Sequence, residues 1–449
     1  METNQPTAIL THKDAVHEHL SAPATPATPT ASTTPGRLPR SEITTLIIGW
    51  ILLGGVLLSA AVILAGLALL FIQHVGLSAQ ALQAFPQTLG QVWSGVVTLQ
   101  PQAIITLGLL LLIATPVMRV AVSIVAFALE KDRRYIVITT IVLTILLVSI
   151  FVVGSLVAGT ASNAVLQVHF SMLVLALIFV ASIVAGLLGS LVGLGGGVLI
   201  VPLLTLAFGF PISLAIGASI ISVIATSSGA AAAYVRDHLT NLRVGMVLEI
   251  ATTTGAITGA FLAGLLAPQL LFIIFGVILL ISAAPLVVKI GEELPKDVKN
   301  DKWANWLRLS GSYPDQHLGR VVPYQVTRTP LGAGMMYIAG LISGLLGIGS
   351  GTFKVIAMDT LMRLPMKVST TTSNFMIGVT AAASAGIYFS RGDIPPLVAA
   401  PVALGILTGA LIGARLLVHL SNKTLRLIFL PVIILAALEM VLHGFGIGI

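Results

Sequence analysis

The sequence predicts an all-α integral membrane protein, with an N-terminal three-helix membrane domain followed by two inverted repeats, each a Gly-broken hairpin plus three transmembrane helices. Three observations lead to this fold class. The 449 residues are 56% hydrophobic and only 9% charged, which is too apolar for a soluble protein. Continuous apolar windows of about 20 residues, long enough to cross roughly 30 Å of hydrocarbon, recur from Ile43 almost to the C-terminus. The third observation is an internal repeat, described below.

The N-terminal part is expected to hold a tail and three membrane spans. Residues 1–40 include a Pro/Thr/Ala tract with too few bulky apolar groups to bury, so they are predicted to form a disordered cytoplasmic tail. The first apolar run begins too far from Met1, and is too long, for a signal peptide, so it is interpreted as a retained span. Residues 41–168 are then a three-span membrane domain of unassigned role, with spans at about 44–72, 102–128 and 136–158.

Loop charges orient these spans. Arg37 and Arg40 precede the first span and "EKDRR" (130–134) separates the second from the third, whereas 73–101 and 159–168 carry no charge. Lys and Arg gather on the cytoplasmic side of membrane proteins. The N-terminus is therefore predicted to be cytoplasmic, and the chain emerges outside after the third span.

The rest of the chain contains the internal repeat. Shifting the sequence by 154 positions, with no gap, superimposes residues of one half on identical residues of the other, which chance explains poorly. The halves are assigned to 169–290 and 331–449, with the Lys- and Arg-rich segment 291–330 as a cytoplasmic linker loop. The matched pairs are Gly186/Gly340, Gly193/Gly347, Gly195/Gly349, Gly197/Gly351, Pro211/Pro365, Ser219/Ser373, Tyr234/Tyr388, Gly255/Gly409 and Gly259/Gly413.

Each half opens with a Gly-rich run that has to turn back on itself. Counting spans from the cytoplasmic linker places both ends of 171–208 outside, so this run is predicted to be a hairpin or re-entrant pair broken near Gly193–Gly197. The same count places both ends of 331–361 inside, which inverts the second half and puts the C-terminus outside. Glycine adopts backbone conformations that other residues resist, and such irregularity is tolerated at membrane depth only where it is protein-buried or lines a cavity.

The Gly-rich runs resemble those of a known family. "GLLGSLVGLGGGVLIVPLL" and its echo "GLISGLLGIGSGTFKVIAM", followed by "GASIISVIATSSGAAAAY" and "TTSNFMIGVTAAASAGIYF", resemble the TauE/SafE family of sulfite exporters over about 170–446. The resemblance implies an anion permease for sulfite, sulfonates or related organosulfur anions, with export driven by the membrane potential or proton gradient. The first three spans, with "LGLLLLIATPVMRVAVSIVAF" and "EKDRRY", are similar to a small uncharacterised membrane domain that can accompany such permeases. The second motif departs from the first, with Ser350 for Gly196 and Lys354 for Ile200, so equivalence of the two halves stays open.

The glycines themselves are the first candidate site. Secondary transporters with inverted repeats hold substrate near the midplane at half-helix ends, where free amides and a partial positive charge suit a small oxyanion. The alternative is that the glycines only permit close helix packing, the role expected for the G-x-x-x-G pairs Gly255/Gly259 and Gly409/Gly413. The residues predicted to bind the anion are Gly195, Gly196, Gly197, Gly349, Ser350 and Gly351.

Polar side chains in the span after each run offer neutral donors to an oxyanion. Ser373 and Asn374 in the second half, and Ser219 and Thr226 in the first, are the predicted ligands. The alternative is that such hydroxyls bond carbonyls of their own helix. Further hydroxyls in the same spans belong to Ser222, Ser227, Ser228 and Thr380.

Charges inside a membrane are costly and are a functional hypothesis by default. Lys354, within the second Gly-rich run, is predicted to attract the anion, unless it snorkels to the surface. Glu249 and Asp359 are the candidates for proton coupling. Against this, Glu249 lies only about 9 Å along a helix from Arg243, which favours an interfacial position, and Asp359 is placed to pair with Arg363.

Other classes of protein are disfavoured. The chain has no cysteine, and H-E-x-x-H, G-x-S-x-G and P-loop motifs are missing, so no enzyme, cofactor or metal is expected. The net charge of +7 comes mainly from loop Lys and Arg, not from a nucleic-acid patch. The expected partners are a small inorganic or organosulfur anion and the lipid of the cytoplasmic membrane, with a homo-oligomer left open. A passive anion channel, and a membrane scaffold or sensor without transport, remain the alternatives to a secondary transporter.

Overall fold

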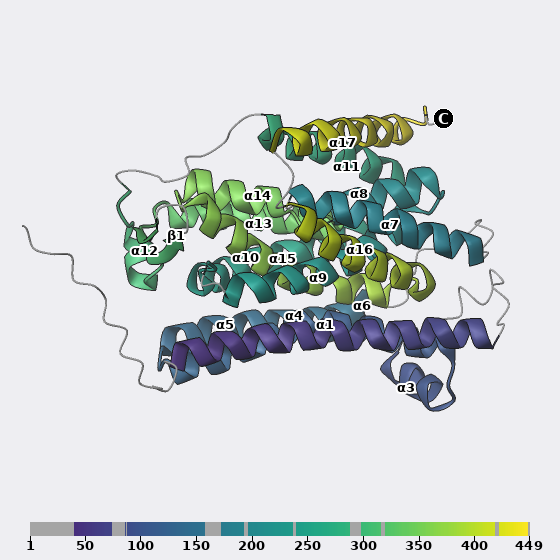
Figure 1. Cartoon of the computed structure of the whole chain (residues 1–449), viewed down its shortest axis with the longest axis horizontal. Helices are drawn as coiled ribbons and strands as arrows, with labels where there is room; N and C mark the ends of the chain where they lie inside the picture. The colour runs from purple at the N-terminus through teal and green to yellow at the C-terminus, as the bar shows by residue number, and fades with distance from the viewer. Residues whose placement is uncertain are drawn as a thin grey trace, which may run out of the picture. The chain divides into compact units, whose positions relative to one another are not determined.

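A computed structural model describes residues 40–447, except 74–85, 87, 158–171, 193–195, 237–238, 288–297, 316–318 and 418–421. Residues 40–449 form one compact unit. Of the predicted features, the tail up to residue 39 and the loop glycines Gly193 and Gly195 lie outside the described residues. The architecture of the described part is helical, as the sequence predicts (Figure 1).

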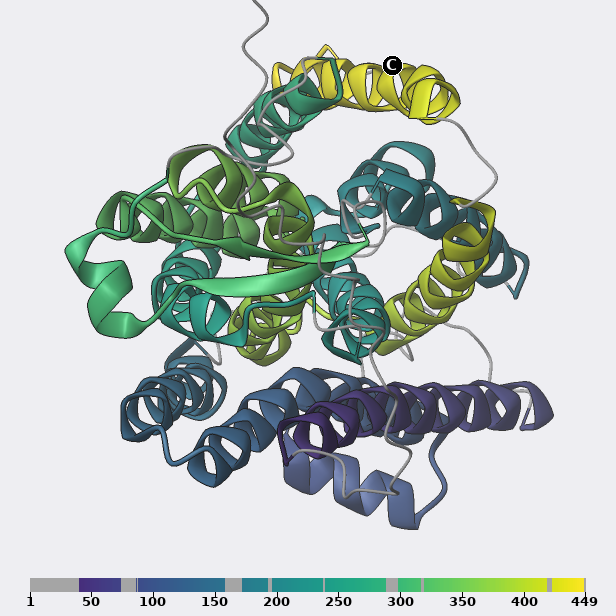
Figure 2. The same cartoon turned by 60° about the vertical axis from the view of Figure 1, so that its left-hand side comes forward.

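An N-terminal three-helix bundle, residues 40–157, forms the lower layer in Figures 1 and 2. α1 and α4 pack closely, because a Cβ on Gly66 would lie 2.7 Å from Ile105 Cγ1 and one on Gly108 would lie 2.6 Å from Ile63 Cγ1. A short helix, α3 (Leu89–Val97), lies in a segment expected only to connect two spans, and Thr88 caps it. The bundle consists of α1 (Arg40–Ile72), α4 (Pro101–Leu129) and α5 (Arg133–Leu147), which continues through the π-helix η1 (Val148–Val153) into α6 (Gly154–Val157).

The remaining membrane helices form two series with the same order, a helix, a break, a short helix with a π-helical turn, and three further helices. The first series is α7 (Met172–Val192), α8 (Gly197–Pro202), η2 (Leu203–Ala207), α9 (Ile212–Arg236), α10 (Leu242–Ala263) and α11 (Pro268–Val287). The second is α13 (Thr329–Leu346), α14 (Gly351–Ile356), η3 (Ala357–Leu361), α15 (Met366–Ser390), α16 (Pro396–Leu417) and α17 (Asn422–Gly444).

Helices of one series pack on helices of the other. The pairs are α7 with α16, α10 with α13, α9 with α15 and α11 with α17. The crossings are tight at glycines 154 positions apart. A Cβ on Gly186 would lie 2.5 Å from the Ile406 carbonyl oxygen, and one on Gly340 would lie 2.1 Å from that of Thr252. Packing is also the role of the G-x-x-x-G residues described, because a Cβ would lie within 2.2 Å of a facing carbonyl oxygen at Gly255, Gly259 and Gly409. These equivalent contacts agree with the predicted repeat.

The segment between the two series contains folded structure where the sequence suggested a polar loop. α12 (Lys302–Leu307) is followed by an antiparallel hairpin of β1 (Gly311–Asp315) and β2 (Arg320–Tyr324), drawn as paired arrows in Figure 2. Each strand is only five residues long and contains a proline, so the strand pattern is weak in the sequence. Asn241, which caps α10, ties this segment to the membrane helices, donating to the Leu309 carbonyl (2.9 Å) and the Tyr324 hydroxyl (2.8 Å).

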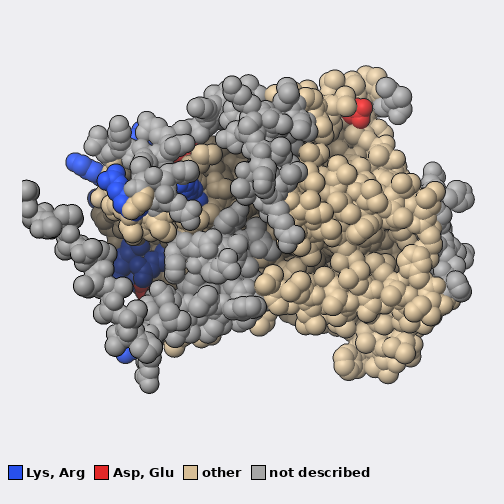
Figure 3. Space-filling model, in the orientation of Figure 1, with Lys and Arg blue, Asp and Glu red and all other residues tan. Residues whose placement is uncertain are grey.

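Seven helices of the described part are long and apolar enough to cross a membrane. Helix α15 is not one of these, although every residue from Thr371 to Tyr388 is buried. Polar residues lower the mean hydropathy of α15. They are tolerated because this helix packs among other helices and not against lipid. Figure 3 shows Lys and Arg gathered at one end of the surface, the end that carries α12 and β1 in Figure 1. The seven helices are Leu53–Ile72, Pro101–Leu129, Arg133–Val157, Met172–Gly189, Leu242–Ala263, Thr329–Leu346 and Pro396–Gly413.

Candidate functional site

The described residues at the break of each series are buried and include left-handed backbone. Between α13 and α14, Gly347, Gly349 and Ser350 have φ values of +68°, +74° and +46°, and all are buried. In the first series Gly196, the residue that corresponds to Ser350, has φ +67°. Glycine adopts these angles without steric cost, whereas Ser350 is held there by its surroundings. The glycines therefore interrupt the helices, as the sequence predicts.

The two breaks lie together, and Ser219 joins them. The Ser219 hydroxyl lies 2.9 Å from the Gly197 carbonyl oxygen and 2.9 Å from that of Gly347, which belong to different series. At the position 154 residues later, Ser373 donates to the Gly351 carbonyl oxygen at 3.2 Å. A Cβ on Gly197 would lie 2.4 Å from Val223 Cγ2, so only glycine fits this contact. Two of the predicted ligands, Ser219 and Ser373, thus hold the breaks in place.

A charged cluster lies beside the second break. Lys354, in α14, is completely buried, and its Nζ donates to Thr380 Oγ1 in α15 at 2.6 Å. Thr380 Oγ1 is 2.8 Å from Glu249 Oε1 in α10, so one hydroxyl links the ammonium to the carboxylate. The second carboxylate oxygen, Oε2, has no hydrogen-bond partner within the described part of the chain. We call Lys354, Thr380 and Glu249 the ion cluster.

The ion cluster corrects two alternatives drawn from the sequence. Lys354 has 0% exposure, so it does not snorkel to the surface. Glu249 has 1% exposure and contacts a helix of the other series, so it is inside the protein and not interfacial. The burial of both side chains follows from tertiary packing, because α10 packs against α13 and α15.

The first series has no equivalent of the ion cluster. The positions 154 residues before Lys354 and Thr380 are Ile200 and Thr226, and the position 154 after Glu249 is Ala403. Thr226 lies beside the break, with its Cγ2 3.7 Å from the place of a Cβ on Gly196. Its hydroxyl is 3.1 Å from the Ser222 and Val223 carbonyl oxygens of its own helix. The two halves are therefore not equivalent.

Two other predicted residues lie near these elements. Asp359 in η3 is buried, and its Oδ1 has no hydrogen-bond partner within the described residues. The expected ion pair with Arg363 is not found among the described residues, where Arg363 is exposed and Asp359 is buried. Asn374 is buried in α15, where its backbone carbonyl oxygen accepts a hydrogen bond from the Ser227 hydroxyl at 2.7 Å. The Ser350 hydroxyl is buried and, among the described groups, without a hydrogen-bond partner.

Arg119 in α4 is a buried charge that the sequence analysis missed. Its Nη1 donates to the Phe375 carbonyl at 2.5 Å, and its Nη2 lies 3.3 Å from Ser228 Oγ. The guanidinium lies 5.0 Å from the centre of the Phe375 ring and interacts electrostatically with Glu249. An arginine near the middle of an apolar span was the signal available in the sequence.

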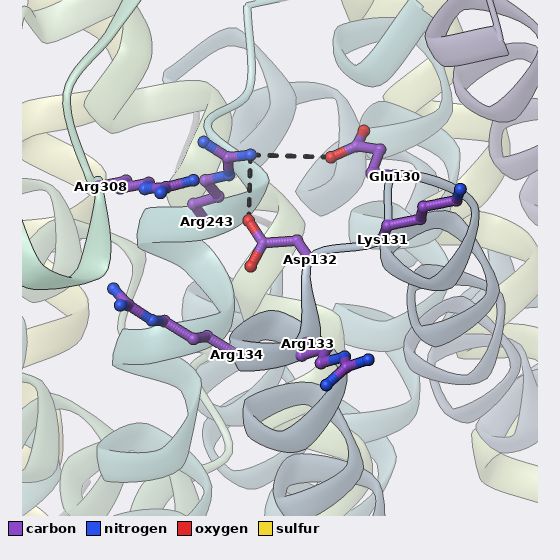
Figure 4. A pocket seen from close by; sticks show the side chains of 7 residues that line it. All are labelled: Glu130, Lys131, Asp132, Arg133, Arg134, Arg243 and Arg308. Atoms are coloured by element: carbon purple, nitrogen blue, oxygen red, sulfur yellow. Dashed lines mark ion pairs between the residues drawn. The ribbon is translucent and has the colours of Figure 1, made fainter.

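A second group of charges lines a pocket of about 570 Å³ between the bundle and α10 (Figure 4). Arg243 bridges Glu130 (3.7 Å) and Asp132 (3.3 Å), while Lys131 and Arg133 point away from it. The two ion pairs of Arg243 join the bundle to α10 at the partly exposed surface. Its lining residues are Glu130, Lys131, Asp132, Arg133, Arg134, Arg243 and Arg308.

Apolar spans with charges buried between broken helices are the features of a multi-pass membrane transporter. The family model described as Sulfite exporter TauE/SafE matches residues 178–440, and the chain belongs to this family. The resemblance seen in the sequence is thus confirmed, and the chain is a transporter and not an enzyme. A second model, described as a protein of unknown function (DUF1634), matches residues 48–151.

Curated relatives carry names of the same kind. The probable membrane transporter protein YunE of Bacillus subtilis is 26% identical over 277 residues, which cover 60% of this chain and 97% of YunE. YdhB of the same species, also named a probable membrane transporter protein, is 26% identical over 54% of this chain and 89% of its own length. ORF9 of Sinorhizobium sp, named likewise, is 25% identical over 59% of this chain and 92% of its own length. No solved structure gives a significant match.

Proposed function

We propose that this chain is a secondary transporter that exports sulfite, a sulfonate or a related small organosulfur anion across the cytoplasmic membrane by alternating access. Its family, the sulfite exporters TauE/SafE, supports the substrate class. The names of its relatives support transport without specifying a substrate.

The observation that carries the proposal is the completely buried Lys354. A buried ammonium requires a compensating charge, and here the nearest carboxylate is reached only through the Thr380 hydroxyl. An oxyanion entering beside Lys354 would replace this indirect contact with direct hydrogen bonds to the ammonium and the Thr380 hydroxyl. The ion cluster is therefore the proposed centre of anion binding.

The second break would supply further donors. The Ser350 hydroxyl, one residue before α14, has no hydrogen-bond partner among the described groups, and the loop holding it is left-handed at Gly349 and Ser350. Successive backbone amides in such loops form concavities that favour anions. We assign Gly349, Ser350 and Gly351 to direct binding, with Ser373 and Asn374 on the adjacent α15. In the first series, Gly196, Gly197, Ser219 and Thr226 would form the facing wall, and Gly195, outside the described residues, stays a predicted ligand.

Alternating access would arise from two inverted halves, 169–290 and 331–449, rocking about the joined breaks. Equivalent close contacts 154 residues apart, at Gly186 and Gly340, support two related halves. We place the N-terminus in the cytoplasm and the C-terminus outside. This orientation is supported by the gathering of Lys and Arg at one end of the surface (Figure 3), opposite the end of α17 in Figure 1.

Proton coupling would use Glu249. Protonation of its carboxylate would remove the negative charge that balances Lys354, leaving the ammonium free to hold an anion. Binding of anion and of proton would then favour each other, so the affinity for the anion would depend on the pH at the side to which the site is open. Asp359, buried without a partner for Oδ1 within the described part of the chain, is the second candidate.

The test is flux of radiolabelled sulfite in proteoliposomes with an imposed proton gradient, comparing wild type with Lys354→Met. The matched control is Lys302→Met, which removes an exposed lysine of α12. We expect wild type and the control to accumulate sulfite against its gradient, an uncoupler to abolish accumulation, and Lys354→Met to lose it while folded. A flux that the uncoupler leaves unchanged, and that never accumulates sulfite beyond its electrochemical equilibrium, would indicate a channel. Absence of flux for sulfite, sulfonates and carboxylates would indicate a scaffold or sensor.

A further inference from the structure

We propose that Arg119, supplied by the N-terminal three-helix bundle, is a positioning residue of the anion site, so that the bundle is a working part of the transporter. Arg119 holds the α15 backbone beside the ion cluster and adds a second fixed positive charge there. This inference rests on the proposed function and extends it to a domain with no assigned role.

The position of Arg119 ties the bundle to the transporter helices. It lies ten residues before the end of α4 at Leu129, roughly 15 Å along the helix axis, and is too deep for its guanidinium to remain in water. Its exposure is 0%, and its polar contacts outside α4 are made to Phe375 and Ser228, which belong to α15 and α9. An arginine facing lipid at this depth would be strongly unfavourable, so the bundle requires these two helices as its partners.

The bundle also holds α15 on the far side of Thr380. Ser149 in η1 donates to the Ala383 carbonyl at 2.5 Å, and a Cβ on Gly386 would lie 2.7 Å from Ile150 Cα. Phe375 precedes Thr380 by little more than one helical turn, and Ala383 follows it by less than one. The bundle thus contacts α15 on both sides of the hydroxyl that links Lys354 to Glu249.

The charge of Arg119 bears directly on anion binding. Arg119 Nη1 lies 3.6 Å from the place of a Cβ on Gly378, two residues before Thr380 of the ion cluster in the same helix. With Lys354 and Arg119 charged and Glu249 ionised, these three buried groups carry a net formal charge of +1. A singly charged anion would neutralise this set, and an interior of low dielectric strengthens the attraction. Unlike lysine, arginine cannot be deprotonated in a protein, so it supplies a constant charge.

YunE, one of the relatives, is too short to contain the bundle as well as the matched transporter part. YunE is covered over 97% of its length by 60% of this chain, so about 40% of this chain has no counterpart there. The family match begins only at residue 178, after the bundle. The contribution of Arg119 is therefore a property that separates this chain from the shorter transporters.

The experiment measures KM and maximal rate of sulfite flux in proteoliposomes for the full chain and for Arg119→Met, Arg119→Lys and Ser228→Ala. Arg134→Met is the matched control, because Arg134 also joins the bundle to a later segment, donating to the Trp306 carbonyl at an exposed site. Melting temperature is measured on every variant, so that loss of packing is separated from loss of binding.

We expect Arg119→Met to raise KM about tenfold, the size of a lost charge-assisted contact. Arg119→Lys, which keeps the charge, should restore most of the affinity, and Ser228→Ala should raise KM by about twofold. Arg134→Met should leave KM unchanged. If Arg119→Met does not fold, Ser228→Ala decides: a KM equal to wild type in that variant would overturn the proposal. A lower melting temperature with unchanged KM in Arg119→Met would reduce Arg119 to a packing role. Absence of anion flux in wild type would overturn the proposed function itself, and this inference with it.

Discussion

Lys354 Nζ donates a 2.6 Å hydrogen bond to Thr380 Oγ1, and both side chains are completely buried. The hydroxyl in turn faces Glu249 Oε1 at 2.8 Å, so a single oxygen stands between the two opposite charges. Removing it should therefore affect the ammonium and the carboxylate together.

Thr380→Val replaces the linking hydroxyl with a methyl group of similar size. We expect a loss of about 1–3 kcal/mol of stability and a large fall in anion flux, because Lys354 and Glu249 each lose a buried partner. Thr106→Val is the matched control, since Thr106 is also completely buried and its hydroxyl donates to the Gln102 carbonyl of its own helix at 2.7 Å. Thermal unfolding and proteoliposome flux measure both effects. Equal behaviour of the two variants would contradict a special role for the ion cluster.

Glu249→Gln should separate transport from the proton gradient. The amide cannot ionise, so Lys354 is permanently free to hold the anion, and flux should become passive and insensitive to an uncoupler. The measurement is sulfite accumulation with and without an imposed pH difference. Asp359→Asn tests the second coupling candidate, and Glu439→Gln, an exposed acid on α17, is the control. Uncoupler-sensitive accumulation in Glu249→Gln would rule this residue out as the coupling group.

Gly340→Ala should destabilise the crossing of α13 and α10. A Cβ there would lie 2.1 Å from the Thr252 carbonyl oxygen, and backbone cannot yield as a flexible side chain does, so we expect a cost of about 1–3 kcal/mol. Gly334→Ala, in the same helix with nothing within 4 Å of the new Cβ, should instead gain about 0.5–1 kcal/mol. Melting temperatures of the two variants should therefore move in opposite directions. An increase in the melting temperature of both variants would show that the two helices can separate freely at this crossing.

Asn241→Ala should loosen the segment between the two series. The substitution removes the N-cap of α10, whose oxygen accepts from the Val244 amide at 3.0 Å, and both hydrogen bonds to the Leu309 and Tyr324 groups. A cap alone contributes about 1 kcal/mol. We expect a lower melting temperature and faster proteolysis near residues 302–324, compared with Asn305→Ala on the exposed side of α12. Unchanged proteolysis would show that α12 and the hairpin are held by other contacts.

Single cysteines test the orientation, because the natural chain has none. With a membrane-impermeant maleimide on intact cells, Ile447→Cys should be labelled from outside and Ser310→Cys only after lysis. Both side chains are exposed in the structure. Reversed labelling would invert the proposed topology, and labelling of both without lysis would contradict the assignment of 291–330 to the cytoplasm.

Sequence patterns were sufficient for the features that depend on nearby residues. Hydropathy predicted the spans of the bundle, and the Gly-rich runs predicted the breaks seen at Gly196 and Gly347–Ser350. Glycine at helical spacing predicted the close crossings at Gly255 and Gly409, which any small-residue face can make. The 154-residue shift predicted two repeated halves, and both the repeat and the inversion of the halves stay predictions.

The tertiary structure alone decided which charges meet. Glu249 is near Arg243 in sequence, but the packing of α10 against α15 puts it beside Thr380, 131 residues away. Arg119 finds its partner at Phe375, 256 residues later. Pattern and spacing report on one helix at a time, whereas the cost of burying a charge is offset by groups from other helices. The sequence therefore determined that this is a helical membrane protein with broken hairpins, and packing between distant helices determined where its ion cluster lies.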